Sequence, residues 1–440
     1  MAEYGFRRFA WEKLSQGEDN CLLAVPELSD GFDLSLPQGK PGLGLMPVSY
    51  CTENVPFGIY RVSLSFTAME DIPKLYLFTG RRQLREVCSM KKGECFSAVY
   101  YQSAAEIIPR YHAKAYPARH LFFTLCTEKP GDIRLGECRA EPADGEAFRI
   151  FLCGDSTVTD HPSEIPYHPG ACYGAWGQAL PAFLTGAAAV ENQAHCGLTT
   201  EDFRGEGHWK LVLRHLKGGD ICLFQFGHND QKLPHLWPNG EYPGNLSRFV
   251  RETREKGAFP VLVTPLGRNT WTKDQAYLDL LGEHAQAVRD VGEALDVPVI
   301  DLHRYSTHWI KAQGMEACRS YFHPGDYTHT NDYGAVLFAR WIAGELAKVF
   351  PEKLRADGRG ASFAPASGFS PGSGSFLGEK EGFVPPPDLW EMLRQGQPAG
   401  KRKGTPLQDK EQFDQMEKST AGLLEMIAQA KKGSLGKDCV

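Results

Sequence analysis

Residues 148–160 read Phe-Arg-Ile-Phe-Leu-Cys-Gly-Asp-Ser-Thr-Val-Thr-Asp, an apolar run that ends in a polar turn. The run from Phe148 to Cys153 suits a buried β-strand. Ser156 follows a flexible Gly, and in an open parallel sheet the loops after the strands form the ligand crevice. The stretch therefore predicts a parallel sheet with a candidate functional serine at its edge. Taken alone, the Gly-Asp-Ser tripeptide fits a turn-capping serine equally well.

The same order of strand, loop and helix repeats along the chain after residue 148. Further apolar runs of strand length occupy 189–192, 220–226, 259–264 and 297–301. Such nearly continuous runs are typical of parallel strands that helices cover on both faces. Helical spacing of apolar residues appears in 177–184, 245–256, 275–294 and 331–349, where Thr330 or Asn331 can cap the last helix. We expect a three-layer α/β/α domain over residues 148–350.

The sequence before residue 146 has a different texture. Short β-rich runs at 60–67, 74–78, 96–101 and 120–126 are separated by segments with Gly, Pro, Asn and Asp. The first run alternates polar and apolar residues, as a half-buried antiparallel strand does. Residues 1–145 are therefore predicted to form a β-sandwich, or jelly-roll-like, accessory domain.

The last part of the chain, residues 351–440, has two parts. Residues 357–376 are rich in Gly, Ser, Ala and Pro, which is typical of a linker. After Lys410, apolar side chains at near-helical spacing predict one amphipathic helix: Phe413, Met416, Leu423, Leu424 and Ile427. This helix would dock on the body of the protein or on a second copy of the chain, so the sequence is compatible with a homo-oligomer.

Length and composition limit the class of protein. The chain has 440 residues, 42% hydrophobic and 23% charged, which suits two globular domains with connecting sequence. The formal net charge of −6 favours neither a nucleic acid nor an acidic membrane surface as partner. The first twenty residues are charged without an apolar core, and no window reaches the ~18 apolar residues of a membrane span. We therefore expect a cytoplasmic protein.

Two more polar clusters follow predicted secondary structure in the α/β part. Gly227-His228-Asn229-Asp230 comes directly after the run 220–226, so the Asn229 amide either caps that strand or points into the crevice as a donor. Asp326-Tyr327-Thr328-His329 precedes the last helix. An Asp and a His three residues apart on one turn can lie side by side, so that the carboxylate orients the imidazole.

Taken in chain order, these signals carry a resemblance. GDS, then a Gly, then GxND, then DxxH, each after a strand or before the last helix, resembles the SGNH (GDSL-type) hydrolase superfamily. The strings GDSTVTD, GAWGQ, ENQAHCGLTT, GHND and DYTHTNDYGA are similar to its rhamnogalacturonan acetylesterase family. The resemblance covers residues 148–350 and implies a flavodoxin-like domain. One departure is Gly197-Leu198-Thr199, where many relatives have Gly-Arg-Ser.

The resemblance also implies roles for individual residues. Ser156 would be the nucleophile, His329 the general base and then acid, and Asp326 the group that holds the imidazole. The oxyanion hole would combine the backbone N–H groups of Ser156 and Gly197 with the Asn229 amide. Candidate substrate contacts are Asp155, Trp176 and His228. No metal ion or organic cofactor is expected.

The expected substrate is an acetyl ester on a plant-type oligosaccharide of pectic, rhamnogalacturonan-like kind. Residues 233–245 are rich in Pro, Gly and Asn, which favours a wet sugar cleft over the apolar lid of a lipase. Two alternatives stay open. One is an SGNH esterase or lipase that acts on another acyl ester. The other is a catalytically inactive carbohydrate-binding protein, with sugar faces stacked on Trp176, Trp237 or Trp271.

Overall fold

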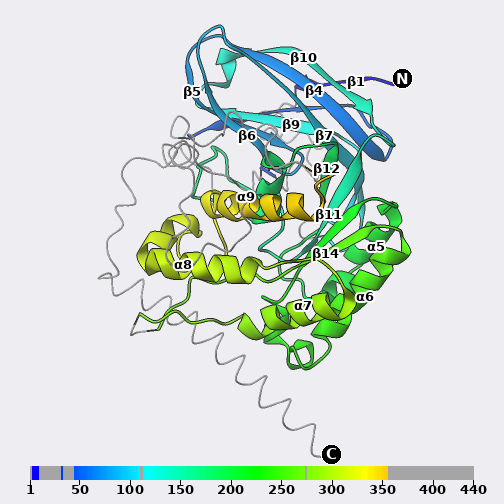
Figure 1. The fold of residues 1–440 in the computed structure, drawn as a ribbon. Coiled ribbons are helices and arrows are strands. Elements are labelled where there is room, and N and C mark those ends of the chain that lie inside the picture. The colour runs from blue at the N-terminus through cyan, green and yellow to red at the C-terminus, as the bar shows by residue number, and fades with distance from the viewer. Residues whose placement is uncertain (1, 9–30, 33–43, 110–111, 273–274, 355–440) are drawn as a thin grey trace, which may run out of the picture.

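The computed structural model describes residues 2–8, 31–32, 44–109, 112–272 and 275–354 (Figure 1). Its central element is a five-stranded sheet in the order β12-β11-β13-β14-β15, and every neighbouring pair is parallel. The strands are β11 (Phe148–Gly154), β12 (Ala188–Asn192), β13 (Ile221–Gln225), β14 (Phe259–Val263) and β15 (Val299–Ile300). The predicted α/β region with a parallel sheet is confirmed.

Helices cover both faces of this sheet because alternate strand residues point to opposite sides. Ile150 and Leu152 belong to one apolar cluster, whereas Phe151 and Cys153 belong to another. The first cluster includes residues of α3 (Trp176–Ala179), α8 (Leu302–Cys318) and α9 (Asp332–Val349). The second includes residues of α4 (Thr200–Gly205), α5 (His208–His215), α6 (Tyr242–Glu255) and α7 (Gly282–Leu295). In Figure 1, α8 and α9 lie on one side of the sheet and α5, α6 and α7 on the other.

The N-terminal part contains two antiparallel sheets of five strands each. The first has the order β1-β10-β4-β7-β8, with β1 (Tyr4–Gly5), β10 (Ile133–Pro142), β4 (Gly58–Ala68), β7 (Cys95–Ile107) and β8 (Tyr116–Ala118). The second has the order β2-β3-β9-β5-β6, with β2 (Arg7–Arg8), β3 (Met46–Cys51), β9 (Phe122–Thr127), β5 (Ile72–Thr79) and β6 (Gln83–Met90). One apolar cluster takes residues from both sheets, among them Val62, Leu64, Leu77 and Leu125.

Strand β5 joins these sheets to the α/β region, because both of its faces are buried. Leu75 and Leu77 belong to the cluster between the two antiparallel sheets. Tyr76 and Phe78, which point the other way, belong to the cluster that also contains strand β11 and helix α9. The N-terminal sheets and the α/β region therefore share apolar contacts across the change in sequence texture near Phe148.

Two predicted helices differ most from the observed ones, and helix α6 begins at Tyr242, before its predicted start at residue 245. The segment predicted as helical from residue 275 becomes helix α7 only at Gly282. Gln275 has a positive φ of 60°, Tyr277 forms a β-bridge with Trp271, and Asp279 accepts the backbone N–H of Leu281. The segment predicted at 177–184 is a single turn, α3, followed by a 3₁₀ turn. The 3₁₀ turns are Pro130–Asp132, Leu180–Ala182, Asp230–Lys232, Pro234–Leu236 and Arg319–Tyr321.

Helix α9 is capped as predicted, since the Asn331 side chain accepts the N–H groups of Tyr333 and Gly334. The predicted linker and the C-terminal amphipathic helix lie outside the described residues, which end at Leu354. Within the part of the chain that is described, no helix combines the length and the apolar character needed to cross a membrane.

Candidate active site

The candidate site lies where the order of the parallel sheet reverses. Strand β11 comes first in the α/β region and has β12 on one side and β13 on the other. If the five strands are numbered 1 to 5 along the chain, their order across the sheet is 2-1-3-4-5. The chain therefore leaves β11 toward one edge of the sheet and β13 toward the other, which opens a crevice beyond the carboxyl ends of these two strands. The β11 strand leads into Asp155 and Ser156, and β13 leads into His228 and Asn229.

Three predicted residues meet at this edge in a continuous hydrogen-bonded row. The Oγ atom of Ser156 lies 2.8 Å from Nε2 of His329, and Nδ1 of His329 lies 2.7 Å from Oδ2 of Asp326. A proton on Nδ1 satisfies the carboxylate and leaves Nε2 free to accept from the hydroxyl. This is the arrangement in which an imidazole can take the proton of an attacking serine.

The Asp326 carboxylate is fixed by its neighbours along the chain. Its Oδ1 accepts the backbone N–H groups of Thr328 at 2.8 Å and His329 at 3.0 Å, and the Tyr173 hydroxyl donates to Oδ2 at 3.4 Å. Burial raises the pKa of Asp326, but the His329 ring and the two backbone N–H groups outweigh it and hold the pKa well below its usual range. The group is therefore an anion that orients the imidazole.

Ser156 is held in place by polar contacts of its own loop. The Oδ1 atom of Asp155 accepts the backbone N–H of Thr157 at 2.9 Å and its hydroxyl at 2.8 Å. The carbonyl of Ser156 lies 2.6 Å from Nε2 of His161. Burial, with a smaller contribution from His329, lowers the pKa of His161 to about 3, so the ring is neutral and donates through Nε2. The nucleophile candidate thus sits on a fixed turn.

The two predicted oxyanion donors besides Ser156 lie on adjoining loops. Gly197 is exposed, has a positive φ of 84°, and an added Cβ would have no atom within 4 Å. The half-buried Asn229 donates through Nδ2 to the carbonyl of Leu198 at 3.1 Å, and its Oδ1 accepts from Lys232 at 2.9 Å. An amide nitrogen carries two hydrogens, so this bond leaves Asn229 one further N–H to donate.

The three candidate substrate contacts lie in the interior. Asp155, Trp176 and His228 are 0%, 1% and 2% exposed. The indole of Trp176 donates to Gln225 at 2.7 Å, and Nε2 of His228 lies 2.9 Å from the carbonyl of Leu266. The burial shows these side chains supporting the loops around the site, and their contact with a substrate stays a prediction.

Several residues near the site carried no signal in the sequence. Tyr173 is 36% exposed, and its ring stacks on His323 with centroids 3.6 Å apart. The buried Arg268 donates to the Thr328 hydroxyl and, at 3.3 Å, to the carbonyl of His228. None of them belongs to a short motif, because their partners come from distant loops.

Over the described ranges, no group of three or more His, Cys, Asp or Glu side chains is placed to hold a metal ion.

Part of the chain is similar to known proteins. Residues 152–336 match the GDSL-like Lipase/Acylhydrolase family. The rhamnogalacturonan acetylesterase RhgT of Bacillus subtilis is 35% identical over 209 residues, which span 44% of this chain and 88% of that protein. The chain belongs to the GDSL-like lipase/acylhydrolase family. The rhamnogalacturonan acetylesterase of Emericella nidulans is 26% identical over 219 residues, 44% of this chain and 82% of that protein.

Membership of the GDSL-like family confirms the SGNH resemblance and makes this chain an esterase. The matched segment begins within strand β11 and ends within helix α9, so it contains Ser156, Asn229, Asp326 and His329. The two antiparallel N-terminal sheets lie outside it.

Proposed function

We propose that this esterase removes acetyl groups from acetylated plant-type oligosaccharides of pectic, rhamnogalacturonan-like kind. Two relatives that align along most of their own length are named as rhamnogalacturonan acetylesterases, which supports this substrate class. The observation that carries the chemistry is the hydrogen-bonded row of Ser156, His329 and Asp326 at the edge of the parallel sheet. A serine, a base and an orienting carboxylate in contact are the parts that acyl transfer requires.

In the first half-reaction, Oγ of Ser156 attacks the acetyl carbonyl carbon while its proton moves to Nε2 of His329. The carbonyl oxygen becomes an anion, which the N–H groups of Ser156 and Gly197 and the Asn229 amide stabilise. The imidazolium lies against the Asp326 carboxylate, so its charge is balanced. When the carbonyl re-forms, the C–O bond to the sugar breaks and His329 returns the proton to the sugar oxygen.

In the second half-reaction, a water molecule attacks the acetyl-Ser156 ester. His329 takes one proton from that water, and the same donors hold the new oxyanion. Collapse of this intermediate breaks the bond to Oγ, His329 protonates the serine, and acetic acid leaves and gives its proton to bulk water to become acetate. Every proton in this scheme moves among Ser156, His329, water and the sugar.

The test compares esters that separate the substrate classes. We expect the protein to release acetate from acetylated rhamnogalacturonan oligosaccharides and to prefer p-nitrophenyl acetate over the octanoate. Hydrolysis of aryl esters without acetate release from any acetylated oligosaccharide would assign the enzyme to another acyl ester. A complete lack of hydrolysis, with binding of the oligosaccharide retained, would indicate a carbohydrate-binding protein.

A further inference from the structure

The turn between β5 and β6 places an arginine inside the α/β region. Arg82 has a positive φ of 61°, a conformation that is unfavourable for a residue with a side chain, and its N–H donates to the Gly80 carbonyl at 3.0 Å. Its side chain is only 1% exposed. A buried charge destabilises a protein unless its hydrogen bonds are satisfied, so the partners of this guanidinium decide its role.

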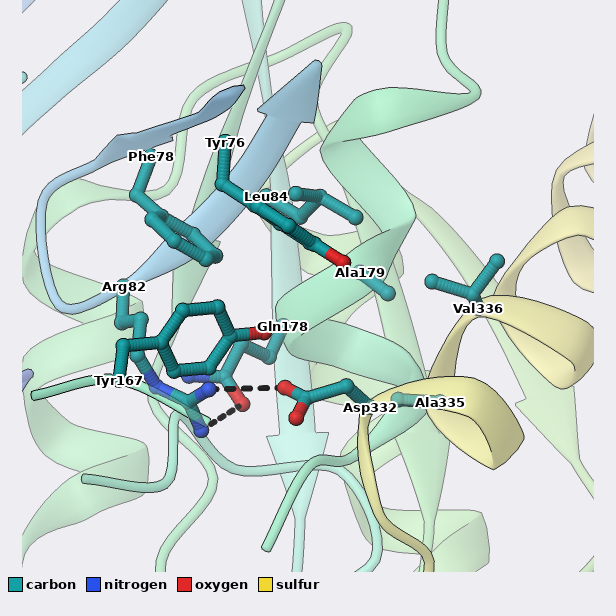
Figure 2. A pocket seen from close by; sticks show the side chains of 10 residues that line it. All are labelled: Tyr76, Phe78, Arg82, Leu84, Tyr167, Gln178, Ala179, Asp332, Ala335 and Val336. Carbon is teal, nitrogen blue, oxygen red and sulfur yellow. Dashed lines mark hydrogen bonds and ion pairs between the residues drawn. The ribbon is translucent and has the colours of Figure 1, made fainter. Parts of the chain in front are cut away.

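The guanidinium bonds to three segments of the α/β region. Its Nε donates to the carbonyl of His161 at 3.1 Å, and Nη2 donates to the carbonyl of Tyr173 at 2.6 Å. Its Nη1 forms an ion pair with Oδ1 of Asp332 at 2.8 Å. Figure 2 shows the fork reaching Asp332 and Gln178 beside the ring of Tyr167. The rigid planar fork of an arginine can fix several acceptors at once.

Two of these segments contact a member of the Ser-His-Asp row, and the third follows His329 directly in the chain. The ring of His161 bonds to the carbonyl of Ser156, and the hydroxyl of Tyr173 donates to Asp326. Asp332 is the first residue of α9 and lies three residues after His329. One guanidinium therefore bonds to the segments that hold all three proposed catalytic side chains.

The residues on either side of Arg82 extend the same contact to the neighbouring loop. Arg81 Nε lies 3.5 Å from Asp160 Oδ2, and the Gln83 amide donates to that oxygen at 3.1 Å. The other oxygen of Asp160 accepts from Asn192 at 2.8 Å, and Arg81 also donates to the Asn192 carbonyl. Asn192 ends strand β12, and the loop after it contains Gly197.

We propose that Arg82 is a positioning residue for catalysis, through which the N-terminal sheets keep Ser156, Asp326 and His329 at hydrogen-bonding distance from one another. The inference rests on the triad under the proposed function. It assigns the N-terminal sheets a part in turnover that does not require them to touch substrate. Misplacing reacting groups by about 1 Å lowers rates by about 10²-fold, so the geometry of these supports affects kcat directly.

The experiment compares Arg82→Lys and Arg82→Ala with the wild type on p-nitrophenyl acetate. Lysine keeps a positive charge beside Asp332 but lacks the fork, so we expect kcat per folded molecule to fall by about 10-fold, and by about 100-fold for alanine. KM should change by less than about threefold, because the residue does not touch substrate. In Arg82→Ala, millimolar guanidinium should restore part of kcat, whereas tetramethylammonium at equal concentration should not.

The matched control is Arg85→Ala. Arg85 lies on the same hairpin and bonds to the Thr79 hydroxyl at 2.9 Å and the Tyr101 carbonyl at 3.0 Å, both within the N-terminal sheets. Its kcat should stay within about twofold of the wild type. If neither Arg82 variant folds, Asp332→Asn tests the ion pair between Arg82 and helix α9. We then expect a several-fold lower kcat per folded molecule.

Wild-type kcat in folded Arg82→Lys and Arg82→Ala, or in Asp332→Asn where it alone can be tested, would overturn the positioning role. So would a loss that the folded fraction fully explains. Failure of the triad itself is a separate result, because it would appear as retained activity in Ser156→Ala. Failure of the proposed substrate class would leave hydrolysis of the aryl acetate unchanged.

Discussion

The loop after β11 carries Ser156 and the loop before α9 carries His329, and local contacts hold each of these loops, whereas long-range contacts join the turn between β5 and β6 to both. Asp155 and Asp326 bond to backbone groups two or three residues away in the chain. Arg82 instead bonds across 79 residues to His161 and across 250 residues to Asp332. The reacting groups are thus carried by local turns, whereas contacts between distant segments set how those turns face one another.

The largest expected effect comes from the local side of this comparison. Ser156→Ala removes the nucleophile, and removing the corresponding serine in another hydrolase lowers kcat about 10⁶-fold. We expect ester hydrolysis to be lost while the melting temperature stays within a few degrees, because the variant gives up the hydrogen bond from Oγ to His329 and leaves the backbone of the turn unchanged. Ser247→Ala on helix α6 is the control and should keep full activity. Substantial activity in folded Ser156→Ala would refute the triad.

The second prediction tests whether the two regions fold as one unit. Phe78 faces the α/β region and Leu77 the cluster between the N-terminal sheets, and both are nearly fully buried. Phe78→Ala should lower the free energy of unfolding by about 3–5 kcal/mol and Leu77→Ala by about 2–5 kcal/mol. Because β5 belongs to both clusters, each variant should shift one shared urea transition.

Two probes check this expectation. Tryptophan emission follows chiefly the α/β region, where six of the eight tryptophans of the chain lie, among them Trp176, Trp209 and Trp309. Far-UV circular dichroism follows all three sheets. Coincident transitions that move together in both variants are expected. Two separate transitions, each shifted by one variant only, would show that the N-terminal sheets unfold independently.

The third prediction concerns the Asn229 amide. Removal of one oxyanion donor in other enzymes lowers turnover by about 10²–10³, so Asn229→Ala should do the same with a smaller change in KM. Asn229→Asp should be at least as damaging, because a carboxylate repels the developing oxyanion. If Asn229 only joins its loop to Leu198, both variants will lose thermal stability and keep turnover per folded molecule. Melting temperature and kcat from the same preparation decide between these outcomes.

The strands and turns that depend on a short stretch of neighbouring residues could be predicted from the sequence alone. The strand 148–153 with Ser156 behind it, the Asn229 cluster and the Asp326–His329 turn all follow from local patterns. Trp176 is expected at the crevice as a ring that could stack on a sugar, yet its indole is buried and donates to Gln225. Arg82 was not expected at all, since the run Thr79-Gly-Arg-Arg-Gln resembles an exposed hairpin turn. Only the packing of β5 against the α/β region shows that this turn is buried.

The smallest expected effect is a pH dependence that depends on the link between the two regions. The backbone carbonyl of His161 accepts a hydrogen bond from Arg82, and the His161 ring donates one to the carbonyl of Ser156. Burial is the main reason that the pKa of His161 is lowered to about 3, so below about pH 6.5 the unfolded chain binds a proton that the folded protein does not. Protonation therefore favours unfolding as the pH falls. The contribution is roughly 1.4 kcal/mol per pH unit, or about 2 kcal/mol between pH 6.5 and 5.

In His161→Gln this contribution should disappear, because an amide can donate to the Ser156 carbonyl but does not titrate. Urea unfolding at pH 7, 6 and 5 should show a shallower loss of stability in the variant than in the wild type. His112→Gln, at an exposed position, is the control and should keep the wild-type slope. Equal slopes in His161→Gln and the wild type would mean that His161 is protonated without unfolding. The His161 ring, which links the Arg82 turn to Ser156, would then carry a proton and a positive charge in the folded protein at acidic pH.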